Sequence, residues 1–327
     1  MKSFEYAAPR TTKEAADLLA DKWGEAEILA GGTDLVTCLK QNIVAPKRVV
    51  SLKNIGALRG IKAEPAQIRV GAMTTLAEFA AHPAVKENFP ALVTAVKGIG
   101  SPQILAAGTV GGDLCQRPRC WYFRNGHGVL GQLDGASLIP DGDNRYHAIF
   151  GNSGPAYFVS PSSLGPGLIA LGATVIVTGR QEKLREIPAV EFFQTPKTES
   201  DRETALQPGE ILTEIHVPVK KLKNATYEVR HRHGFDWPYV TASVAFNLKD
   251  GVVSDLQVVL GHVAPVPWPA ISAEKVLNGS KVDVAGAELC GQAATEGARP
   301  LSGNGYKLQL VKTAVKRAVL AAAGVAA

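Results

Sequence analysis

The sequence has few cysteines, no long apolar run and no concentration of charge of one sign. Its four cysteines, Cys38, Cys115, Cys120 and Cys290, are too few and too scattered for the disulfide scaffold of a small secreted domain. No apolar run approaches the roughly 20 residues of a membrane helix, and the N-terminal segment lacks the apolar centre of a signal peptide. The formal net charge is only +5, with lysine and arginine scattered. We therefore expect a cytoplasmic protein with neither nucleic acid nor a membrane as partner.

Catalytic and metal-binding constellations are missing as well. No serine, histidine and aspartate fall into a recognisable nucleophile pattern. His231 and His233 alternate with arginines, which is typical of the polar edge of a strand, and Cys290 is too distant in sequence to suggest a zinc site. His147 is expected to make structural hydrogen bonds, and Lys307, at a helix start, is placed to reach a phosphate. We predict no catalytic residue and no metal ligand in this chain.

Length and periodicity indicate a chain of several packed subdomains. A chain of 327 residues is long enough for two cores of ordinary size. Thr11 and Thr75 each precede a glutamate by three residues, the signature of a capping box at a helix start. Helix and strand patterns alternate over the first 110 residues, with strands expected at 26–30, 47–52 and 66–72 and a helix at 34–41. This rhythm favours small α/β layers.

The rest of the chain divides into an irregular segment and a second regular region. Residues 115–165 are rich in Gly, Asn, Asp, Ser and Pro and lack periodicity, which is typical of a functional or inserted loop. Regular patterns resume afterwards, with a helix end and strand at 167–179, a strand at 210–218, a hairpin around Lys249-Asp250-Gly251 and a helix at 306–322.

Two glycine pairs are the strongest functional signal in the residues themselves. "LAGGTDL" spans residues 29–35 and "AGTVGGDL" spans 107–114. Glycine lets backbone N–H groups approach a ligand closely, and N–H groups left free at a helix start bind anions. Neither pair is a dinucleotide fingerprint or a P-loop, and either alone is typical of a tight turn. Together they predict two facing loops that hold both phosphates of a dinucleotide.

Ordered matches along nearly the whole chain resemble a known family. The matching stretches are "ILAGGTDLV", "IRVGAMTTLAEF", "AAGTVGGDL", "GDNRYHAIFG", "SPSSLGPGLIALGA", "GEILTEIHVP", "LGHVAPVPW" and "GARPLSGNGYKLQLV". They resemble the FAD-binding medium subunit of the molybdenum hydroxylases, of the xanthine dehydrogenase, carbon monoxide dehydrogenase and aldehyde oxidoreductase types.

The resemblance implies an α+β fold with two domains. Residues 1–219 would form the two-subdomain FAD-binding α/β unit of the vanillyl-alcohol-oxidase type. Its subdomains would be about 1–56 and 57–219, with an inserted loop at about 115–165. Residues 222–325 would form a sheet with helices, like the C-terminal domain of carbon monoxide dehydrogenase flavoproteins. FAD would lie, bound non-covalently, between the two N-terminal subdomains.

The resemblance also implies the residues that contact FAD. Thr33 and Thr109 would supply hydroxyl hydrogen bonds, and Leu212 would be an apolar contact to the flavin ring. The full set carried over from the family is Ile28, Leu29, Ala30, Gly31, Gly32, Thr33, Asp34, Leu35, Thr109, Gly111, Gly112, Asp113, Ser163 and Leu212. The chain departs from the family at three places. Asp113 replaces an asparagine, Ser163 replaces an aspartate that commonly contacts FAD, and Glu228 replaces a frequent lysine.

The inserted loop raises a separate expectation. Relatives of the aldehyde oxidoreductase type carry a [4Fe–4S] cluster here, held by four cysteines, whereas this loop has only Cys115 and Cys120. Ala156 stands where such relatives have a further cysteine. A disulfide between Cys115 and Cys120 is not expected in a reducing cytoplasm. We therefore predict a loop that has lost its cluster, with Cys120 packed as a small apolar side chain.

The function implied by the resemblance is electron transfer within a complex. A large molybdopterin-binding subunit would hydroxylate the substrate, and a small [2Fe–2S] subunit would pass electrons to FAD in this chain and on to an external acceptor. The alternative is a stand-alone flavin oxidoreductase of the vanillyl-alcohol-oxidase type that acts on a small organic substrate. A nucleotide-binding scaffold without redox activity is a third, weaker alternative.

Overall fold

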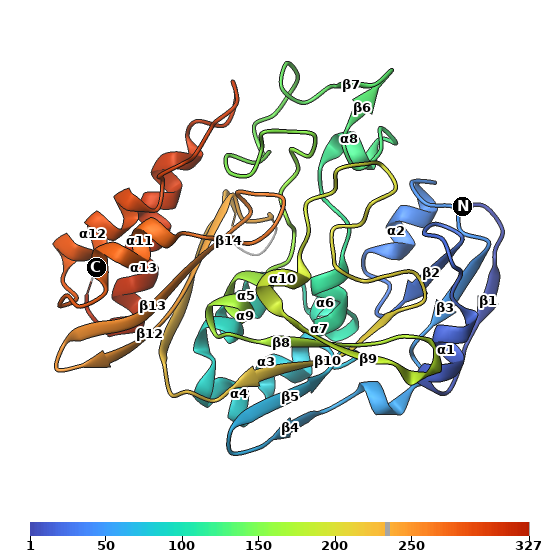
Figure 1. Ribbon diagram of the computed structural model, residues 1–327, viewed down its shortest axis with the longest axis horizontal. Helices are drawn as coiled ribbons and strands as arrows, with labels where there is room; N and C mark the ends of the chain where they lie inside the picture. The colour runs from blue at the N-terminus through green and yellow to red at the C-terminus, as the bar shows by residue number, and fades with distance from the viewer. Residues whose placement is uncertain (233–235, 327) are drawn as a thin grey trace.

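The computed structural model describes residues 1–232 and 236–326. Figure 1 shows the N-terminal sheet at one side in blue, the C-terminal domain at the other in orange and red, and a five-stranded sheet between them. The inserted loop, in green, rises above this row. Within the described ranges, no helix is both long and apolar enough to cross a bilayer.

The N-terminal subdomain is a small parallel sheet with the order β1-β3-β2. Its elements are β1 (Glu5–Ala7), α1 (Thr12–Leu18), β2 (Ala26–Leu29), α2 (Leu35–Lys40) and β3 (Arg48–Ser51). Thr11 Oγ1 accepts the Glu14 N–H at 3.1 Å, but the Glu14 carboxylate accepts the Arg10 N–H, so only half of the predicted capping box forms. β2 and β3 run parallel. The first glycine loop connects the end of β2 to the start of α2.

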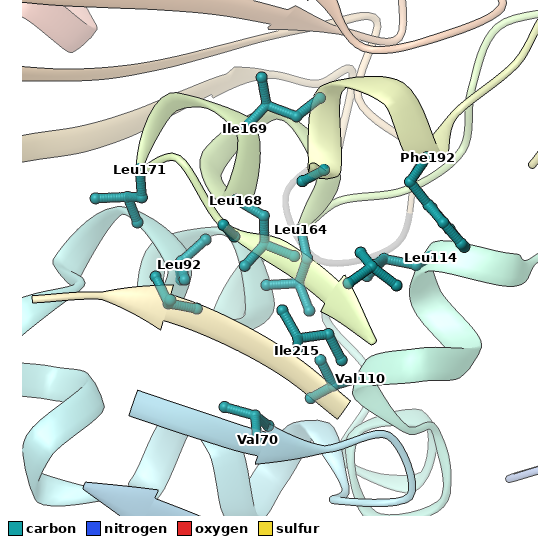
Figure 2. Packing of buried hydrophobic residues seen from close by; sticks show 14 of the residues in the cluster. Val70, Leu92, Val110, Leu114, Leu164, Leu168, Ile169, Leu171, Phe192 and Ile215 are labelled. Atoms are coloured by element: carbon teal, nitrogen blue, oxygen red, sulfur yellow. The ribbon is translucent and has the colours of Figure 1, made fainter. Parts of the chain in front are cut away.

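The second subdomain is an antiparallel five-stranded sheet with the order β4-β5-β10-β8-β9. Its strands are β4 (Ile61–Ala63), β5 (Gln67–Gly71), β8 (Thr174–Thr178), β9 (Leu184–Pro188) and β10 (Ile211–Pro218). The α-helices of this part are α3 (Leu76–Ala81), α4 (Pro83–Asn88), α5 (Pro90–Gly98), α6 (Pro102–Ala107), α7 (Val110–Cys115), α9 (Gly165–Ala170) and α10 (Ala189–Phe192). The Thr75 capping box forms completely. Figure 2 shows Leu92, Leu164 and Leu168 packed between the helices and Ile215 of β10.

The C-terminal domain is an antiparallel sheet with helices on one face. Its elements are β11 (Lys223–Val229), β12 (Val240–Lys249), β13 (Val252–Gly261), β14 (Trp268–Pro269), α11 (Ile271–Leu277), α12 (Val284–Ala293) and α13 (Lys307–Ala323). The predicted hairpin turn forms, with Asp250 and Gly251 at φ values of 51° and 79°. Strand β12 is buried along Val240–Phe246 because α13 covers one side of the sheet and α9 of the second subdomain contacts the other.

The inserted loop has little regular structure, as its composition predicts. It contains only α8 (Trp121–Arg124) and the two short strands β6 (Gln132–Leu133) and β7 (Ala136–Ser137) within residues 116–164. A small apolar core nevertheless orders it, made of Phe123, Val129, Leu130, Ala156 and Phe158. The loop is therefore a packed unit.

Candidate cofactor-binding site

A cleft runs between the N-terminal sheet and the five-stranded sheet and continues toward the C-terminal domain. Its first cavity, of about 190 Å³, is lined by β2, the first glycine loop, the start of β10 and the second glycine loop. Its second cavity, of about 410 Å³, lies on the other side of the glycine loops and reaches Arg230 and Trp237. Both cavities are lined by Thr33, Asp34, Thr109, Gly112 and Gln116. The two glycine loops therefore lie where the two cavities of one extended cleft meet, a place that we call the waist of the cleft.

The structure brings most of the predicted site residues to this cleft. The first cavity is lined by Ile28, Ala30, Gly31, Gly32, Thr33, Asp34, Leu35, Thr109, Gly111, Gly112 and Leu212. Asp113 and Ser163 line the second cavity instead. Leu29 lies behind the first loop, where a Cβ on Gly32 would come within 3.3 Å of its side chain. Contacts of these residues with FAD stay a prediction.

The first glycine loop presents unused backbone donors. Among the described residues, the N–H groups of residues 31–35 donate no hydrogen bond. Gly32 has a φ of +82°, the left-handed conformation that glycine adopts without strain and that turns successive N–H groups in one direction. Successive free N–H groups in a turn form an anion-binding concavity. A diphosphate fits this loop.

The second glycine loop differs, because the protein itself uses its donors. The N–H groups donate from Val110 to Thr74 O at 3.0 Å, from Gly111 to Ala72 O at 2.9 Å, from Gly112 to Thr109 Oγ1 at 3.1 Å and from Asp113 to Thr109 O at 2.9 Å. The expectation that both loops offer N–H groups to a diphosphate is therefore wrong for this loop. Among the described residues, what it can still offer is the backbone N–H and the hydroxyl hydrogen of Thr109.

Two of the four glycines are required by contacts within the protein. A Cβ on Gly31 would lie 1.9 Å from the carbonyl oxygen of Ala107, so this glycine lets the two loops touch. A Cβ on Gly111 would lie 2.8 Å from the Cβ of Ala72. Gly112 is different, since its Cβ would meet only the hydroxyl of its own cap, Thr109, at 2.9 Å. Within the second pair, Gly112 is the residue whose missing side chain is not required by packing and could let a ligand approach the backbone closely.

Asp34 joins the first glycine loop to the inserted loop. Its carboxylate lies 2.9 Å from the guanidinium of Arg119 and 2.8 Å from that of Arg124, and it accepts the Arg117 N–H at 2.8 Å. Arg124 also donates to Cys38 Sγ at 2.8 Å. These contacts tie the inserted loop to the first glycine loop, and a contact of Asp34 with FAD stays a prediction.

Asp113 turns away from the cleft waist and caps the start of the segment after the inserted loop. Its carboxylate accepts the Ser162 hydroxyl at 2.6 Å, the Leu164 N–H at 2.9 Å and the Ser163 N–H at 3.2 Å. These donors satisfy the carboxylate within the protein. Ser163 is buried and lines the second cavity.

Two ion pairs at the first cavity were not indicated by the sequence. Arg202 pairs with Glu27 at 2.7 Å and lies over the Trp23 ring, 4.9 Å from its centroid. Arg117 pairs with Glu203 at 3.0 Å. Burial raises the pKa of both carboxyls. Arg202 and Glu27 are 175 positions apart in the sequence, so no local pattern could have indicated the pair.

The cysteines of the inserted loop lie in different surroundings. Cys115 packs at the edge of the second subdomain's core, where burial raises its pKa to about 12. Cys120 packs against the inserted loop's core as expected, and its Sγ lies 3.2 Å from His147 Nε2, a contact the sequence did not indicate. Within residues 1–232 and 236–326, no three His, Cys, Asp or Glu side chains group as metal ligands. The loss of the iron–sulfur cluster stays a prediction for iron analysis to check.

Two expectations about cationic residues are wrong. Lys307 does not reach a phosphate, because it is 1% exposed and its Nζ donates to the carbonyls of Tyr146, His147 and His262 at 2.9–3.1 Å. Burial lowers its pKa to about 7. His231 is not on a strand edge, since β11 ends at Val229, and His233 lies outside the described residues.

The remaining departure from the family, Glu228, forms a buried ion pair. Its carboxylate contacts the guanidinium of Arg230, a residue that lines the second cavity. Burial raises the pKa of Glu228, and Arg230 opposes that shift. Burial lowers the pKa of His147 to about 4, so its imidazole is neutral at physiological pH, and its structural role stays a prediction.

A long cleft with unused backbone donors at its waist defines a protein that holds a dinucleotide between two α/β layers. Comparisons with known proteins agree. The family model described as the FAD binding domain in molybdopterin dehydrogenase matches residues 2–220, and the carbon monoxide dehydrogenase flavoprotein C-terminal domain matches residues 225–322. This chain belongs to the family of FAD-binding domains in molybdopterin dehydrogenases.

Individual relatives resemble the chain over almost its full length. The aldehyde oxidoreductase FAD-binding subunit of Escherichia coli (strain K12) is 29% identical, with 95% of this chain and 96% of that protein covered. The carbon monoxide dehydrogenase medium chain of Hydrogenophaga pseudoflava is also 29% identical, with 98% and 96% covered. A solved structure of carbon monoxide dehydrogenase from the same organism matches with a TM-score of 0.77 and 27% identity, over 100% of this chain and 99% of that one.

These matches confirm several predictions made from the sequence. The α+β fold class, the flavoprotein family, FAD as the cofactor and membership of a class of oxidoreductase subunits are confirmed. The named relatives are FAD or medium subunits of aldehyde, carbon monoxide and xanthine dehydrogenases. The partners of this chain and the direction of electron flow stay predictions.

Proposed function

We propose that this chain is the electron-transfer subunit of a molybdenum hydroxylase complex and holds FAD non-covalently. The observation that supports this most directly is the set of free N–H groups at residues 31–35, placed between two cavities of one cleft. A dinucleotide has a charged diphosphate between two ring systems, so its shape and charge match a donor-lined waist with a cavity on each side.

The residues divide the binding work between them. The first glycine loop would hold the diphosphate, with the hydroxyls of Thr33 and Thr109 as additional donors at the waist. Ile28 and Leu212 give the first cavity apolar walls. Bound FAD would supply the redox chemistry, because it takes up two electrons and releases them singly or together.

The cleft itself is poorly suited to oxidise an organic substrate directly. Among the described residues, no histidine lines either cavity of the cleft. Its carboxylates are all held by arginines or N–H groups, as Glu27, Asp34, Asp113, Glu203 and Asp236 show. A direct oxidase of this fold needs a base over the flavin, so these contacts favour an electron carrier over the stand-alone alternative.

The partners we propose are a large molybdopterin-binding subunit and a small [2Fe–2S] subunit. Support comes from the relatives, whose names make them medium or FAD-binding subunits of larger enzymes. The substrate would be hydroxylated on the large subunit. The electrons would then reach this chain from the small one.

Purification of the full chain, alone and with its co-expressed genomic neighbours, tests the proposal. We expect a yellow chain that releases FAD on denaturation, and a complex that contains molybdenum and iron when the neighbours are present. The isolated chain should pass electrons from reduced donors to dyes without oxidising aldehydes or purines. A colourless chain that takes up no added FAD, or turnover of an aldehyde by the isolated chain, would contradict it.

A further inference from the structure

A third cavity lies outside the cofactor cleft, between the inserted loop and the C-terminal domain. It has a volume of about 350 Å³, and we call it the aromatic cavity. Arg119 and Trp237 line both this cavity and the second cavity of the cleft. The guanidinium carbon of Arg119 lies 4.7 Å from the centroid of the Trp237 ring, so this stacked pair separates the two spaces.

The walls of the aromatic cavity are flat rings. Trp121, Tyr146, Trp237 and Tyr239 all line it. The rings of Tyr146 and Tyr239 stack, with centroids 5.4 Å apart and planes 15° apart, and Trp121 lies 5.3 Å from Tyr146. Tyr146 is 41% exposed and Trp237 is 42% exposed, although both are large aromatic side chains. Partly exposed rings around a concave space are suited to stacking against a planar ligand.

The lining offers one unused donor of a charged group to an acceptor. Two guanidinium groups line the cavity, but Arg119 already pairs with Asp34 at 2.9 Å and Arg232 with Asp236 at 3.2 Å. Arg119 Nε is buried and has no hydrogen-bond partner among the described residues. A buried N–H of a charged group is stabilised by an acceptor, and a carboxylate is the acceptor that guanidinium groups bind best.

Two buried imidazoles lie in the same wall. His147 and His262 are 3% and 2% exposed, and within the described residues His147 Nδ1 and His262 Nε2 have no hydrogen-bond partner. Buried polar atoms in folded proteins are usually satisfied by a partner. The aromatic cavity therefore combines flat apolar walls with unsatisfied polar atoms, which is the composition of a small-molecule site.

We propose that the aromatic cavity binds a planar aromatic carboxylate at a site separate from the cofactor cleft. The ring stacks among the side chains of Trp121, Tyr146 and Trp237, and the carboxylate pairs with the guanidinium side of the cavity. Binding at this site does not depend on the proposed electron-transfer function, because the stacking rings line a cavity outside the cofactor cleft.

Isothermal titration of the full chain loaded with FAD tests the site, with 2-naphthoate as the probe. We expect a dissociation constant below about 1 mM, the range that ligand efficiency gives for a ligand of this size. Cyclohexanecarboxylate has the charge without the planar ring, and 2-naphthalenemethanol has the ring without the charge. Both should bind at least about tenfold more weakly if stacking and ion pairing each contribute.

Two variants locate the binding. Tyr146→Ala removes one wall and should weaken 2-naphthoate binding about tenfold, the size of an aromatic contact of about 1.4 kcal/mol. The matched control, Tyr6→Ala, removes a 58%-exposed tyrosine on β1 and should leave binding unchanged. Arg232→Gln should weaken binding and reduce its dependence on salt. FAD content should be unchanged in all three variants.

Three outcomes would overturn the proposal. One is the absence of binding up to millimolar 2-naphthoate. Another is displacement of FAD by the probe, which would place the binding in the cofactor cleft. The third is equal affinity of the Tyr146→Ala and Tyr6→Ala variants for the probe.

Discussion

The two glycine loops look alike in sequence but differ in the structure in how their backbone N–H groups are used. Both contain a Gly-Gly pair, but the first pair precedes the six-residue helix α2, whereas the second lies inside the six-residue helix α7. In the first loop the N–H groups of residues 31–35 have no acceptor among the described residues. In the second loop the N–H groups of residues 110–113 are all donated within the protein.

The difference comes from what lies against each loop. The second loop lies against the turn after β5, whose carbonyls at Ala72 and Thr74 accept its first two N–H groups. The first loop has no such strand end beside it and touches the second loop instead, through Gly31 and Ala107. One loop therefore offers donors and the other fixes its position. Substitutions at matched positions test this difference between the two loops.

Gly31→Ala should have the largest effect. The added Cβ would lie 1.9 Å from Ala107 O, so the two loops must separate, and we expect the free energy of unfolding to fall by about 3 kcal/mol with loss of FAD. Urea unfolding and FAD content measure both. Gly56→Ala is the control, because nothing lies within 4 Å of its Cβ. Equal stability of the two variants would show that the loops do not touch as described.

Asp113→Asn should act on the second loop's support. In asparagine one of the two carboxylate oxygens is replaced by an NH₂ group, which donates and cannot accept. Whichever oxygen is replaced, at least one of the buried donors that Asp113 now accepts from loses its acceptor. We expect a loss of about 2 kcal/mol of stability, with FAD affinity changed less. Asp141→Asn, on an exposed carboxylate, is the control. A variant that keeps its stability but loses FAD would place Asp113 in the cofactor site instead.

Gly32→Ala should separate donor geometry from stability. Alanine at a φ of +82° destabilises the fold by about 1 kcal/mol and shifts the direction of the neighbouring N–H groups. Gly60→Ala has a similar backbone conformation, at a φ of +96°, and lies away from the cleft lining. We expect Gly32→Ala to be somewhat the less stable, because its Cβ would also lie 3.2 Å from Val36 and 3.3 Å from Leu29 whereas nothing lies within 4 Å at Gly60, and we expect weaker FAD binding in Gly32→Ala alone. Fluorescence titration of FAD into the apoproteins gives the affinities.

Gly112→Ala should change stability least. Its position inside a helix favours alanine by about 1 kcal/mol, and this offsets the 2.9 Å approach to the Thr109 hydroxyl. Gly286→Ala is closely matched, since Gly286 also donates to its helix cap, Asp283, and its Cβ would lie 3.2 Å from that side chain. Weaker FAD binding in Gly112→Ala, beside unchanged stability in both, would show that this glycine serves the ligand. Unchanged FAD binding would assign it to packing.

Local patterns in the sequence predicted most elements of the fold. The Thr75 capping box, the hairpin at Asp250-Gly251 and the strand before the first glycine loop depend on neighbouring residues, so periodicity and turn chemistry indicate them correctly. The family resemblance added the cleft and its cofactor. These features are either short-range or repeated across many relatives.

Features that depend on long-range contacts were not predictable. Nothing near residues 110–113 says that Ala72 and Thr74 will accept their N–H groups. The ion pair between Glu27 and Arg202 joins residues from different subdomains. A lysine at a helix start suggests an anion, and only the packed structure shows that carbonyl groups surround Lys307. Burial and distant partners decided each of these cases.

Lys307 also limits how the two halves of this protein can be recombined. The two family models divide the chain between residues 220 and 225, which invites the exchange of one half for that of a relative. The Lys307 side chain belongs to the second half, but two of its three carbonyl acceptors, Tyr146 and His147, belong to the first. Those two acceptors are backbone carbonyls, which any residue type provides, so a chimera keeps them only if the foreign N-terminal half follows the same backbone path at residues 146–147. The path of the inserted loop, rather than its side chains, therefore decides whether the two halves can be exchanged.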